Sequence, residues 1–339
     1  MSFTVTIQNS AQQFGTNPGE TILDAALRDN RIFPYGCRNG VCGACKCNLV
    51  SGAVDYGDYE EFTLTDEEKA EGKVLICQAI PLEDVTIDAE EVMTGQNIQI
   101  KMLPCRVGRM EQLSADVMRL FLTLPRTQEF NFIPGQYIDL LMKDGQRRSF
   151  SIANQPELTR EEGLELHIRL VPGGHFTPRV FDAMKERDLL RLEGPFGTYF
   201  LQTDVDRPII MVAGGTGFAP VKGLIEHAIA KDERYAIHLF WGARDEQDLY
   251  LDSLAGEWAA RLANFRYTPV LSESTSTTWA GATGFAHEAV LASYDDFSGF
   301  DVYASGPPVM VDAVRDHLGD RGMSLDHFHF DSFEFAHES

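Results

Sequence analysis

Four of the six cysteines are spaced as in an iron–sulfur site. Cys37, Cys42 and Cys45 follow the pattern C-x4-C-x2-C, and Cys77 comes after a further gap of 31 residues. This is the plant-type 2Fe–2S spacing, in which one loop supplies three thiolates and a distant strand supplies the fourth. A structural zinc site more often shows two C-x2-C pairs or Cys/His pairs. We therefore predict that these four cysteines bind a 2Fe–2S cluster.

Two glycine-rich turns point to a nucleotide. Residues 214–220 read G-G-T-G-F-A-P between a buried-type strand at 208–213 and a helical pattern at 219–230. Glycines at such a turn let the backbone approach a pyrophosphate at the helix N-terminus. Because many strand–helix turns are rich in glycine, this turn alone leaves an ordinary connection open. A second turn, at 306–308, reads G-P-P after a later strand, and two such turns at one sheet edge define a ligand crevice.

The elements around the cysteines predict a small β-rich domain over residues 1–97. Residues 3–7 alternate as a strand does, residues 21–27 have helical spacing, and 74–77 and 85–87 are typical of short strands. The segment 93–97 lacks apolar periodicity and indicates a linker. The two other cysteines, Cys47 and Cys105, are expected to pack rather than to bind metal.

Two further domains are expected after this linker. Residues 98–205 contain short β-type runs separated by Pro, Gly and charged turns, which predicts an antiparallel barrel. From residue 206 onward strands alternate with helices, which predicts a parallel sheet flanked by helices. The 339 residues are thus expected to divide at 1–97, 98–205 and 206–339.

The charge balance excludes some partners. The net charge is −22, which argues against nucleic acid and against an anionic membrane surface. No apolar run reaches 18 residues and the first residues do not resemble a signal peptide, so we expect no membrane span and a cytoplasmic location. The charge is divided unevenly: −10 in residues 1–97, 0 in 98–205 and −12 in 206–339.

Taken in order, the motifs resemble a known family. The run Arg148-Ser149-Phe150-Ser151, the turn at 214–220 and the turn at 306–308 follow the order of the ferredoxin–NADP⁺ reductase superfamily. With the cysteine-rich domain, nearly the whole chain is similar to fused flavin and iron–sulfur reductases. These include reductase components of ring-hydroxylating dioxygenases and soluble monooxygenases. Residues 134–140, 147–154, 213–222 and 279–285 look most like the CDP-6-deoxy-glucoseen reductases of 3,6-dideoxysugar synthesis.

The resemblance implies a fold and a set of cofactor contacts. The fold would be a β-grasp ferredoxin, an antiparallel FAD barrel and a Rossmann-like NAD domain. Arg148 would pair with the FAD pyrophosphate, as a guanidinium suits phosphate. Phe150 would stack near the isoalloxazine, with simple core packing as the alternative, and Ser151 would hydrogen-bond flavin N5. The remaining implied contacts are Ser149 for FAD, Gly173, Gly174 and Thr177 as a second phosphate turn, and Gly214, Gly215, Thr216, Gly217, Gly306 and Pro307 for the dinucleotide.

Two residues are expected to act near the reacting atoms. Many relatives carry a cysteine before the Gly-Pro-Pro turn, close to the nicotinamide C4, where this chain has Ser305. That change leaves the fine positioning of hydride transfer open. In the aromatic run 328–335, Phe333 is expected to cover the flavin, with Phe330 and Phe335 as alternatives.

Further residues bear on the coenzyme and on metals. Acidic residues at 245, 246 and 248 favour the free 2′-hydroxyl of NADH, whereas Arg244 would suit the phosphate of NADPH. The histidines at 327, 329 and 337 lack a partnered carboxylate pattern, so we expect no metal there.

The implied function is electron transfer from NADH to FAD, to the 2Fe–2S cluster and then to a partner protein. The partner would be a pyridoxamine-dependent CDP-6-deoxyhexulose 3-dehydrase or, alternatively, an oxygenase component. Two other functions stay open. One is a diaphorase or flavin reductase that reduces small molecules, and the other is a redox-sensing adaptor with an inactive flavin domain. The intact 148–151 motif and glycine-rich turn count against the adaptor.

Overall fold

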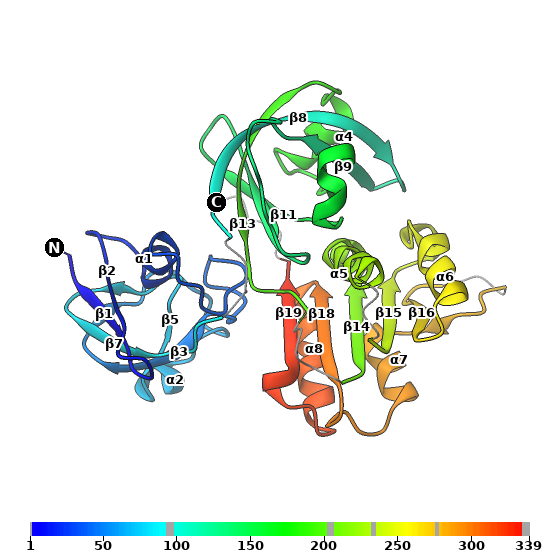
Figure 1. The fold of residues 1–339 in the computed structure, drawn as a ribbon. Helices are drawn as coiled ribbons and strands as arrows, with labels where there is room; N and C mark the ends of the chain where they lie inside the picture. The colour runs from blue at the N-terminus through cyan, green and yellow to red at the C-terminus, as the bar shows by residue number, and fades with distance from the viewer. Residues whose placement is uncertain (1, 93–97, 202–206, 232–234, 275–277, 334–339) are drawn as a thin grey trace. The chain divides into compact units, whose positions relative to one another are not determined.

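The computed structural model describes residues 2–92, 98–201, 207–231, 235–274 and 278–333. The chain divides into two compact units, Met1–Gln99 and Ile100–Ser339 (Figure 1). The predicted linker at 93–97 lies outside the described residues.

The first unit contains a five-stranded sheet in the order β2-β1-β7-β3-β5. Its strands are β1 (Thr4–Ile7), β2 (Gln13–Gly15), β3 (Lys46–Ser51), β5 (Lys73–Leu75) and β7 (Val85–Asp88). A two-stranded sheet pairs β4 (Val54–Asp55) with β6 (Ile80–Pro81), and the helices are α1 (Ile22–Arg28) and α2 (Asp66–Ala70).

Helix α1 begins and packs as its sequence predicts. The Thr21 hydroxyl accepts a hydrogen bond from the Asp24 backbone N–H at 3.1 Å, which caps the first turn. Its buried residues are Ile22, Leu23, Ala25 and Ala26. The helix therefore buries one apolar face, and the chain after it is the loop that carries three of the cysteines.

The second unit begins with a six-stranded antiparallel sheet in the order β11-β10-β13-β8-β9-β12. Its strands are β8 (Lys101–Gln112), β9 (Val117–Thr123), β10 (Tyr137–Leu141), β11 (Arg147–Ser151), β12 (Leu164–Arg169) and β13 (Leu189–Phe196). A bridge between Ile152 and Leu166 joins the two ends of this sheet, so the predicted barrel is confirmed. Short helices lie between the strands: η1 (Pro156–Leu158), α3 (Thr159–Glu162) and α4 (Thr177–Asp182).

A six-stranded parallel sheet follows in the order β17-β16-β15-β14-β18-β19. Its strands are β14 (Ile209–Gly214), β15 (Ile237–Ala243), β16 (Phe265–Leu271), β17 (Ala282–Thr283), β18 (Asp301–Gly306) and β19 (Phe328–Ser332). The order reverses between β14 and β18, and ligands of such sheets bind at that switch point. The last strand, β19, was not predicted, because the aromatic run around it was interpreted as a cover for the flavin and not as part of the sheet.

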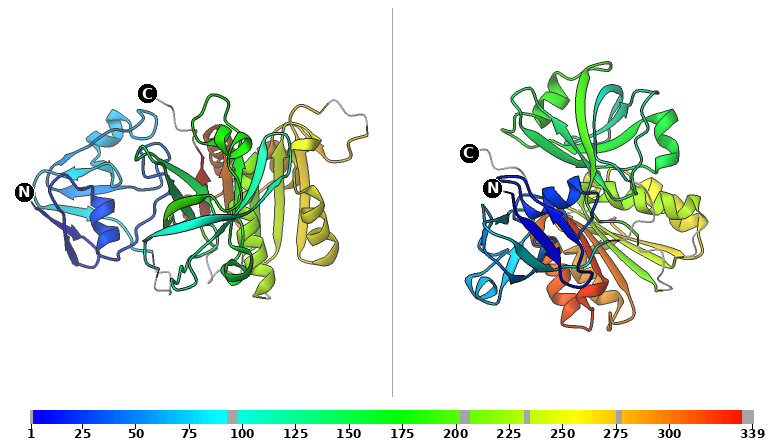
Figure 2. Two further views of the ribbon diagram at one scale, coloured as in Figure 1. Left: turned by 90° about the horizontal axis from the view of Figure 1, so that it is seen from above. Right: turned by 60° about the vertical axis from the view of Figure 1, so that its left-hand side comes forward.

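Helices lie on both faces of the parallel sheet, as the right-hand view in Figure 2 shows. They are α5 (Phe218–Ala230), α6 (Asp252–Arg261), α7 (Ala286–Ser293) and α8 (Pro308–Gly319), with single turns η2 (Gly215–Gly217), η3 (Glu246–Asp248) and η4 (Leu325–His327). Helix α5 is buried on almost every side, because it lies between the barrel and the sheet (Figure 1). None of the helices described here is long and apolar enough to span a bilayer.

Candidate functional site

The four predicted cluster ligands meet in the first unit as two pairs of thiols. Cys37 contacts Cys42, and Cys45 contacts Cys77. Among the described residues, no three His, Cys, Asp or Glu side chains converge as a single metal ion would require. Two pairs of thiols suit a cluster of two irons, each of which takes two protein thiolates.

The loop backbone favours thiolate at one of these positions. The pKa of Cys37 is lowered to about 6, because the Cys42 thiol and the backbone N–H groups of Asn39, Val41 and Cys42 donate to its sulfur. Thiolate is the form that binds metal. Burial and the neighbouring Cys77 sulfur instead raise the pKa of Cys45.

Gly40, in the cysteine loop, has a backbone conformation that favours glycine. Its φ is +80°, and a Cβ there would meet the Asp58 carbonyl oxygen at 2.6 Å and the Tyr59 Cα at 2.9 Å. Gly40 is therefore needed for the packing of the cysteine loop against residues 58–59 as well as for its turn.

A contact of Cys77 was missed by sequence analysis. The Gln78 side-chain N–H₂ group lies 3.9 Å from the Cys77 sulfur and donates to the Arg38 carbonyl at 3.2 Å. Donors to cluster sulfurs tune a reduction potential, so Gln78 belongs to the site. Its position directly after a predicted ligand was the available signal.

Strand β11 carries the predicted flavin motif along one barrel edge. The Arg148 guanidinium is half-buried and donates to the Gln146 side chain at 2.8 Å, and the Ser149 hydroxyl donates to Asp139 at 2.7 Å. The half-buried Phe150 ring lies 5.6 Å from that of Phe176. Phe150 thus packs on its neighbour while keeping an exposed part.

The buried hydroxyl of Ser151 has an acidic partner from the end of the chain. Ser151 Oγ donates to Asp331 Oδ2 at 3.1 Å, and both side chains are 8% exposed. Asp331 lies in β19, 180 residues further along the chain. It was missed because β19 itself was not predicted.

Ser305 lies next to this pair. In the β18–β19 register Ser305 faces Asp331, and Ser305 is fully buried. Its hydroxyl has no hydrogen-bond partner among the described residues. An unsatisfied buried hydroxyl is costly, so a bound group that supplies a partner fits this position.

The glycine-rich turn at 214–217 packs directly onto the end of β18, the strand beside β14 in the sheet. A Cβ on Gly217 would lie 2.0 Å from the Ser305 carbonyl oxygen, and one on Gly214 would lie 2.7 Å from the Met310 sulfur. Gly306 has a φ of +149° and lies against Gly214. These glycines therefore bring the two turns together at the switch point, with Gly215 and Thr216 in the single η2 turn and Pro307 as the residue that precedes α8.

The remaining predicted contacts are placed as follows. Gly173 has a φ of +81° in the turn before α4. The Thr177 hydroxyl accepts from the Val171 N–H at 2.9 Å and so closes this turn, which includes Gly174. The Phe333 N–H donates to the Gly306 carbonyl at 2.9 Å, and this bond sets the half-buried Phe333 beside the second glycine-rich turn.

Of the two alternatives to Phe333 as the ring that covers the flavin, only Phe330 lies among the described residues. The Phe330 ring is stacked on Phe328, with ring centroids 5.4 Å apart, and packs against the core of the sheet. Phe335 lies outside the described residues, as does His337.

Four charged side chains form a chain of ion pairs, called here the Asp116 clasp, at the carboxyl edge of β15. Asp116 Oδ2 lies 2.9 Å from Arg169 Nη2 and 3.3 Å from Arg244 Nη2. Arg244 also pairs with Asp248 at 2.8 Å. Arg169 in turn covers Gly215, where a Cβ would lie 2.8 Å from Nη1. Arg244 is therefore held by two carboxylates.

Comparison with known proteins agrees with this arrangement. Models of a 2Fe-2S iron-sulfur cluster binding domain, an oxidoreductase FAD-binding domain and an oxidoreductase NAD-binding domain match residues 5–82, 104–200 and 211–316. CDP-6-deoxy-L-threo-D-glycero-4-hexulose-3-dehydrase reductase of Yersinia pestis is 41% identical over 98% of this chain and 99% of its own. The chain belongs to the fused iron–sulfur, FAD and NAD reductase family. It is an NAD(P)H-dependent oxidoreductase that carries electrons through FAD and a 2Fe–2S cluster.

Other members of this family serve oxygenases. The reductase component DmpP of phenol 2-monooxygenase from a Pseudomonas species is 36% identical over 97% of this chain and 95% of its own. The solved Amycolatopsis reductase GcoB has a TM-score of 0.82 at 33% identity and covers 98% of both chains. The predicted fold class of this reductase is therefore confirmed in all three parts.

Proposed function

We propose that this reductase takes hydride from NADH and delivers single electrons to a CDP-6-deoxyhexulose 3-dehydrase. The observation that carries the proposal is the 41% identity, over 98% of the chain, to the reductase that serves such a dehydrase in Yersinia pestis. An oxygenase component is the second candidate acceptor, favoured by the 36% identity to the phenol 2-monooxygenase reductase.

Within this proposal each cofactor has its own set of residues. Cys37, Cys42, Cys45 and Cys77 hold the cluster, and the turns at 214–217 and 306–307 hold the dinucleotide. The barrel contacts to FAD come from Arg148, Ser149, Phe150, Ser151, Gly173, Gly174 and Thr177. When bound, the three groups supply hydride donation, two-electron storage and one-electron transfer.

The chain's own contribution at the reacting atoms is orientation. Asp331 accepts a hydrogen bond from the Ser151 hydroxyl and so fixes the direction of that hydroxyl. Ser305 offers a buried hydroxyl from the neighbouring strand, and Phe333 supplies the ring that keeps water from the flavin face. In this proposal these groups align two bound cofactors, and alignment of two reactants can lower a reaction barrier by about 7–11 kcal/mol.

The Asp116 clasp supports NADH as the coenzyme. A 2′-phosphate would need a cation that is not already neutralised, and Arg244 is paired with Asp116 and Asp248. The free 2′-hydroxyl of NADH needs no cation, and acidic residues after the second strand of the parallel sheet can accept a hydrogen bond from it. As a cation after the second strand, Arg244 would suit NADPH. Because two carboxylates already pair with it, the arrangement favours NADH instead.

The domain limits and the location complete the proposal. We place the boundaries at 97/98 and 205/206, one domain for each redox carrier; both fall within or beside segments outside the described residues. A cytoplasmic location suits cysteines that must stay reduced to bind iron. Fractionation of cells followed by immunoblotting tests the location.

One experiment separates the candidate acceptors. The purified reductase is mixed with NADH and either a CDP-sugar dehydrase with its substrate or a Rieske or diiron oxygenase with its substrate. The proposal predicts product only, or far faster, with the dehydrase. Faster turnover with the oxygenase would replace the first candidate with the second.

A further inference from the structure

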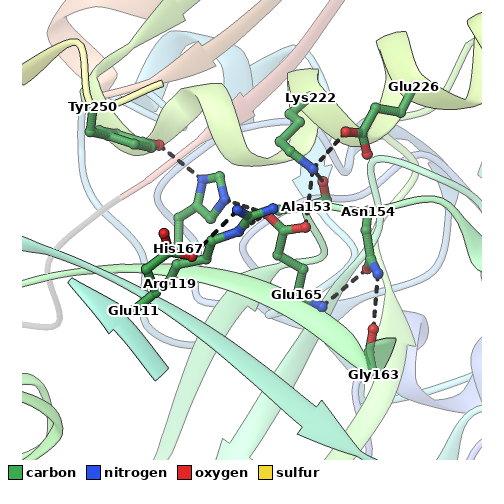
Figure 3. Close-up of polar contacts among 10 residues, drawn as sticks. All are labelled: Glu111, Arg119, Ala153, Asn154, Gly163, Glu165, His167, Lys222, Glu226 and Tyr250. Carbon is green, nitrogen blue, oxygen red and sulfur yellow. Dashed lines mark hydrogen bonds and ion pairs between the residues drawn. The ribbon is translucent and has the colours of Figure 1, made fainter. Parts of the chain in front are cut away.

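A buried lysine on α5 belongs to none of the contacts described above. Lys222 is 1% exposed, and lysine is almost never so buried unless it is paired. Its ammonium nitrogen lies 3.1 Å from the Ala153 carbonyl, 3.0 Å from Glu165 Oε2 and 2.8 Å from Glu226 Oε1 (Figure 3). An ammonium has three N–H donors, so all of them are used.

Glu165 extends this contact to Arg119 on the neighbouring strand β9 and, through His167, to Tyr250, as Figure 3 shows. Its Oε1 accepts from Arg119 Nε at 2.8 Å and from His167 Nε2 at 2.9 Å, and His167 Nδ1 lies 3.0 Å from the Tyr250 hydroxyl. Burial lowers the pKa of His167, so the neutral ring donates from Nε2 and accepts from Tyr250. Burial alone would raise the pKa of Glu165, but it is lowered by the hydrogen bond from His167 and by the charges of Lys222 and Arg119. Glu165 is thus an anion that binds two cations.

This network joins elements that belong to different cofactor sites. Glu165 lies in barrel strand β12, whereas Lys222 lies in α5, directly after the turn at 215–217. The carbonyl that Lys222 binds, that of Ala153, is two residues after Ser151. Gly223, the next residue of α5, also lies close to this segment, because a Cβ there would lie 3.1 Å from the Ile152 carbonyl oxygen.

From this geometry we infer that Lys222 is a positioning residue, which holds α5 against residues 151–154 and thereby aligns the dinucleotide turn with the flavin strand. The inference rests on the proposed function, because it assigns Ser151 and the turn at 215–217 to two cofactors that react with each other. A displacement of about 1 Å can cost about 100-fold in rate when two groups must be aligned.

Net stabilisation is a weaker explanation for this network. A buried ion pair often contributes little net stability, since removing the charges from water costs about as much as their attraction returns. What the lysine adds is a defined geometry: two acceptors outside α5, the Ala153 carbonyl and the Glu165 carboxylate, fix the direction of one nitrogen, and Glu226 on α5 itself takes the third N–H. An apolar side chain would fill the same space without fixing the helix in that direction.

The test compares three variants of the full-length holoenzyme. Lys222→Met removes the charge at similar volume, and Lys222→Arg restores the charge. Lys231→Met makes the same substitution at the end of α5, where Lys231 pairs with Glu157 at 3.2 Å on a half-exposed surface. Stopped-flow bleaching of the flavin gives the limiting rate of reduction and the apparent NADH affinity. Hydrogen exchange of the same holoenzymes, measured without NADH, reports on residues 151–154 and 215–219.

The expected result is a limiting rate about 10- to 100-fold lower in Lys222→Met, with NADH affinity within about threefold of wild type. Lys222→Arg recovers part of this rate, and Lys231→Met equals wild type. Exchange at residues 151–154 and 215–219 rises in Lys222→Met only. A wild-type rate and wild-type exchange in Lys222→Met would overturn the inference.

A second variant covers the case in which Lys222→Met does not fold. Gly223→Ala moves α5 away from the Ile152 carbonyl by a few tenths of an ångström and leaves every charge in place. The inference predicts a lower limiting rate for this variant as well, and an unchanged rate would contradict it. Failure of the proposed reaction between NADH and FAD looks different, since wild type itself would then show no flavin bleaching with NADH, whichever acceptor is used.

Discussion

Asp331 is the side chain that orients the hydroxyl of Ser151, a residue that we propose contacts the flavin. Its carboxylate accepts a hydrogen bond from the Ser151 hydroxyl and therefore orients Ser151. It also lies beside Ser305, its partner in the β18–β19 register. The structure thus gives Ser151 a fixed hydroxyl direction before any cofactor is considered. Because its O–H is donated to Asp331, Ser151 presents its oxygen lone pairs in a fixed direction, and preorganised groups of this kind need no rearrangement during the reaction.

Asp331→Ala should therefore slow hydride transfer without weakening coenzyme binding. The Ser151 hydroxyl loses its acceptor and can rotate, so we expect the limiting rate of flavin reduction to fall about tenfold or more while the apparent NADH affinity stays near wild type. Stopped-flow measurement gives both values. Asp326→Ala, on an exposed side chain of the same C-terminal segment, is the control and should behave as wild type. An equal fall in both variants would assign the effect to general destabilisation.

At the residue scale, the sequence predicts groups of residues that lie close together along the chain, but it does not predict contacts between distant residues. The cluster ligands were predictable because three of them share one loop with a fixed spacing. Gln78 and Asp331 were not, because their roles come from the fold: Gln78 reaches back to Arg38, and Asp331 reaches Ser151 across 180 residues.

At the scale of elements, the turn before α5 packs tightly against the end of β18. A Cβ on Gly217 would lie 2.0 Å from the Ser305 carbonyl oxygen, which no side-chain rotation can relieve. Gly217→Ala must push α5 or β18 aside. The expected cost is about 1–3 kcal/mol of unfolding free energy, together with weaker NADH binding.

Chemical denaturation and NADH titration check this prediction. Gly256→Ala is the matched control, because Gly256 lies within α6 with nothing within 4 Å of its added Cβ. That control should gain up to about 1 kcal/mol, as alanine favours a helix. A Gly217→Ala protein as stable as the control would show that the turn tolerates a side chain.

The Asp116 clasp links three elements and makes a prediction about the coenzyme. In the double variant Asp116→Asn/Asp248→Asn, Arg244 loses both anionic partners. We expect the ratio of kcat/KM for NADPH to that for NADH to rise about tenfold, the equivalent of one charge-assisted hydrogen bond of about 1.5 kcal/mol. Steady-state assays with both coenzymes measure the ratio. Asp312→Asn, which breaks the exposed pair with Arg315, should leave the ratio unchanged; a rise there too would point to overall charge.

Element types after residue 206 were largely predictable. The predicted strand–helix alternation is found in β14 to α8, because each strand is an apolar run and each helix has its period, but the two-residue strand β17 in that range was not predicted. Strand β19 was missed because its alternation is short: Phe328 and Phe330 pack against the core of the sheet, but Asp331 and Ser332 are both polar. Its place beside β18 depends on tertiary pairing.

At the scale of the whole molecule, charge divides along the chain. Residues 1–97 carry −10 of the total −22, and residues 98–205 carry none. A strongly acidic ferredoxin unit suits a basic face on the electron acceptor, because opposite charges steer encounter.

Electron delivery to the acceptor should therefore slow as salt rises. We expect the second-order rate constant for acceptor reduction to fall at least about tenfold between low and high ionic strength, since surface charges are screened beyond about 10 Å at 0.1 M salt. Flavin reduction by NADH, followed separately, is the internal control and should change far less. A salt-independent acceptor rate would refute electrostatic docking.

The central claim is that electrons pass from NADH through the flavin to the cysteine-bound cluster, and one measurement tests it directly. The purified protein is mixed with NADH without oxygen, frozen, and studied by electron paramagnetic resonance. The account predicts the signal of a reduced 2Fe–2S cluster in wild type and its loss in Cys77→Ser, in which NADH still bleaches the flavin. A fully bleached flavin beside a cluster that stays oxidised in wild type would contradict the account.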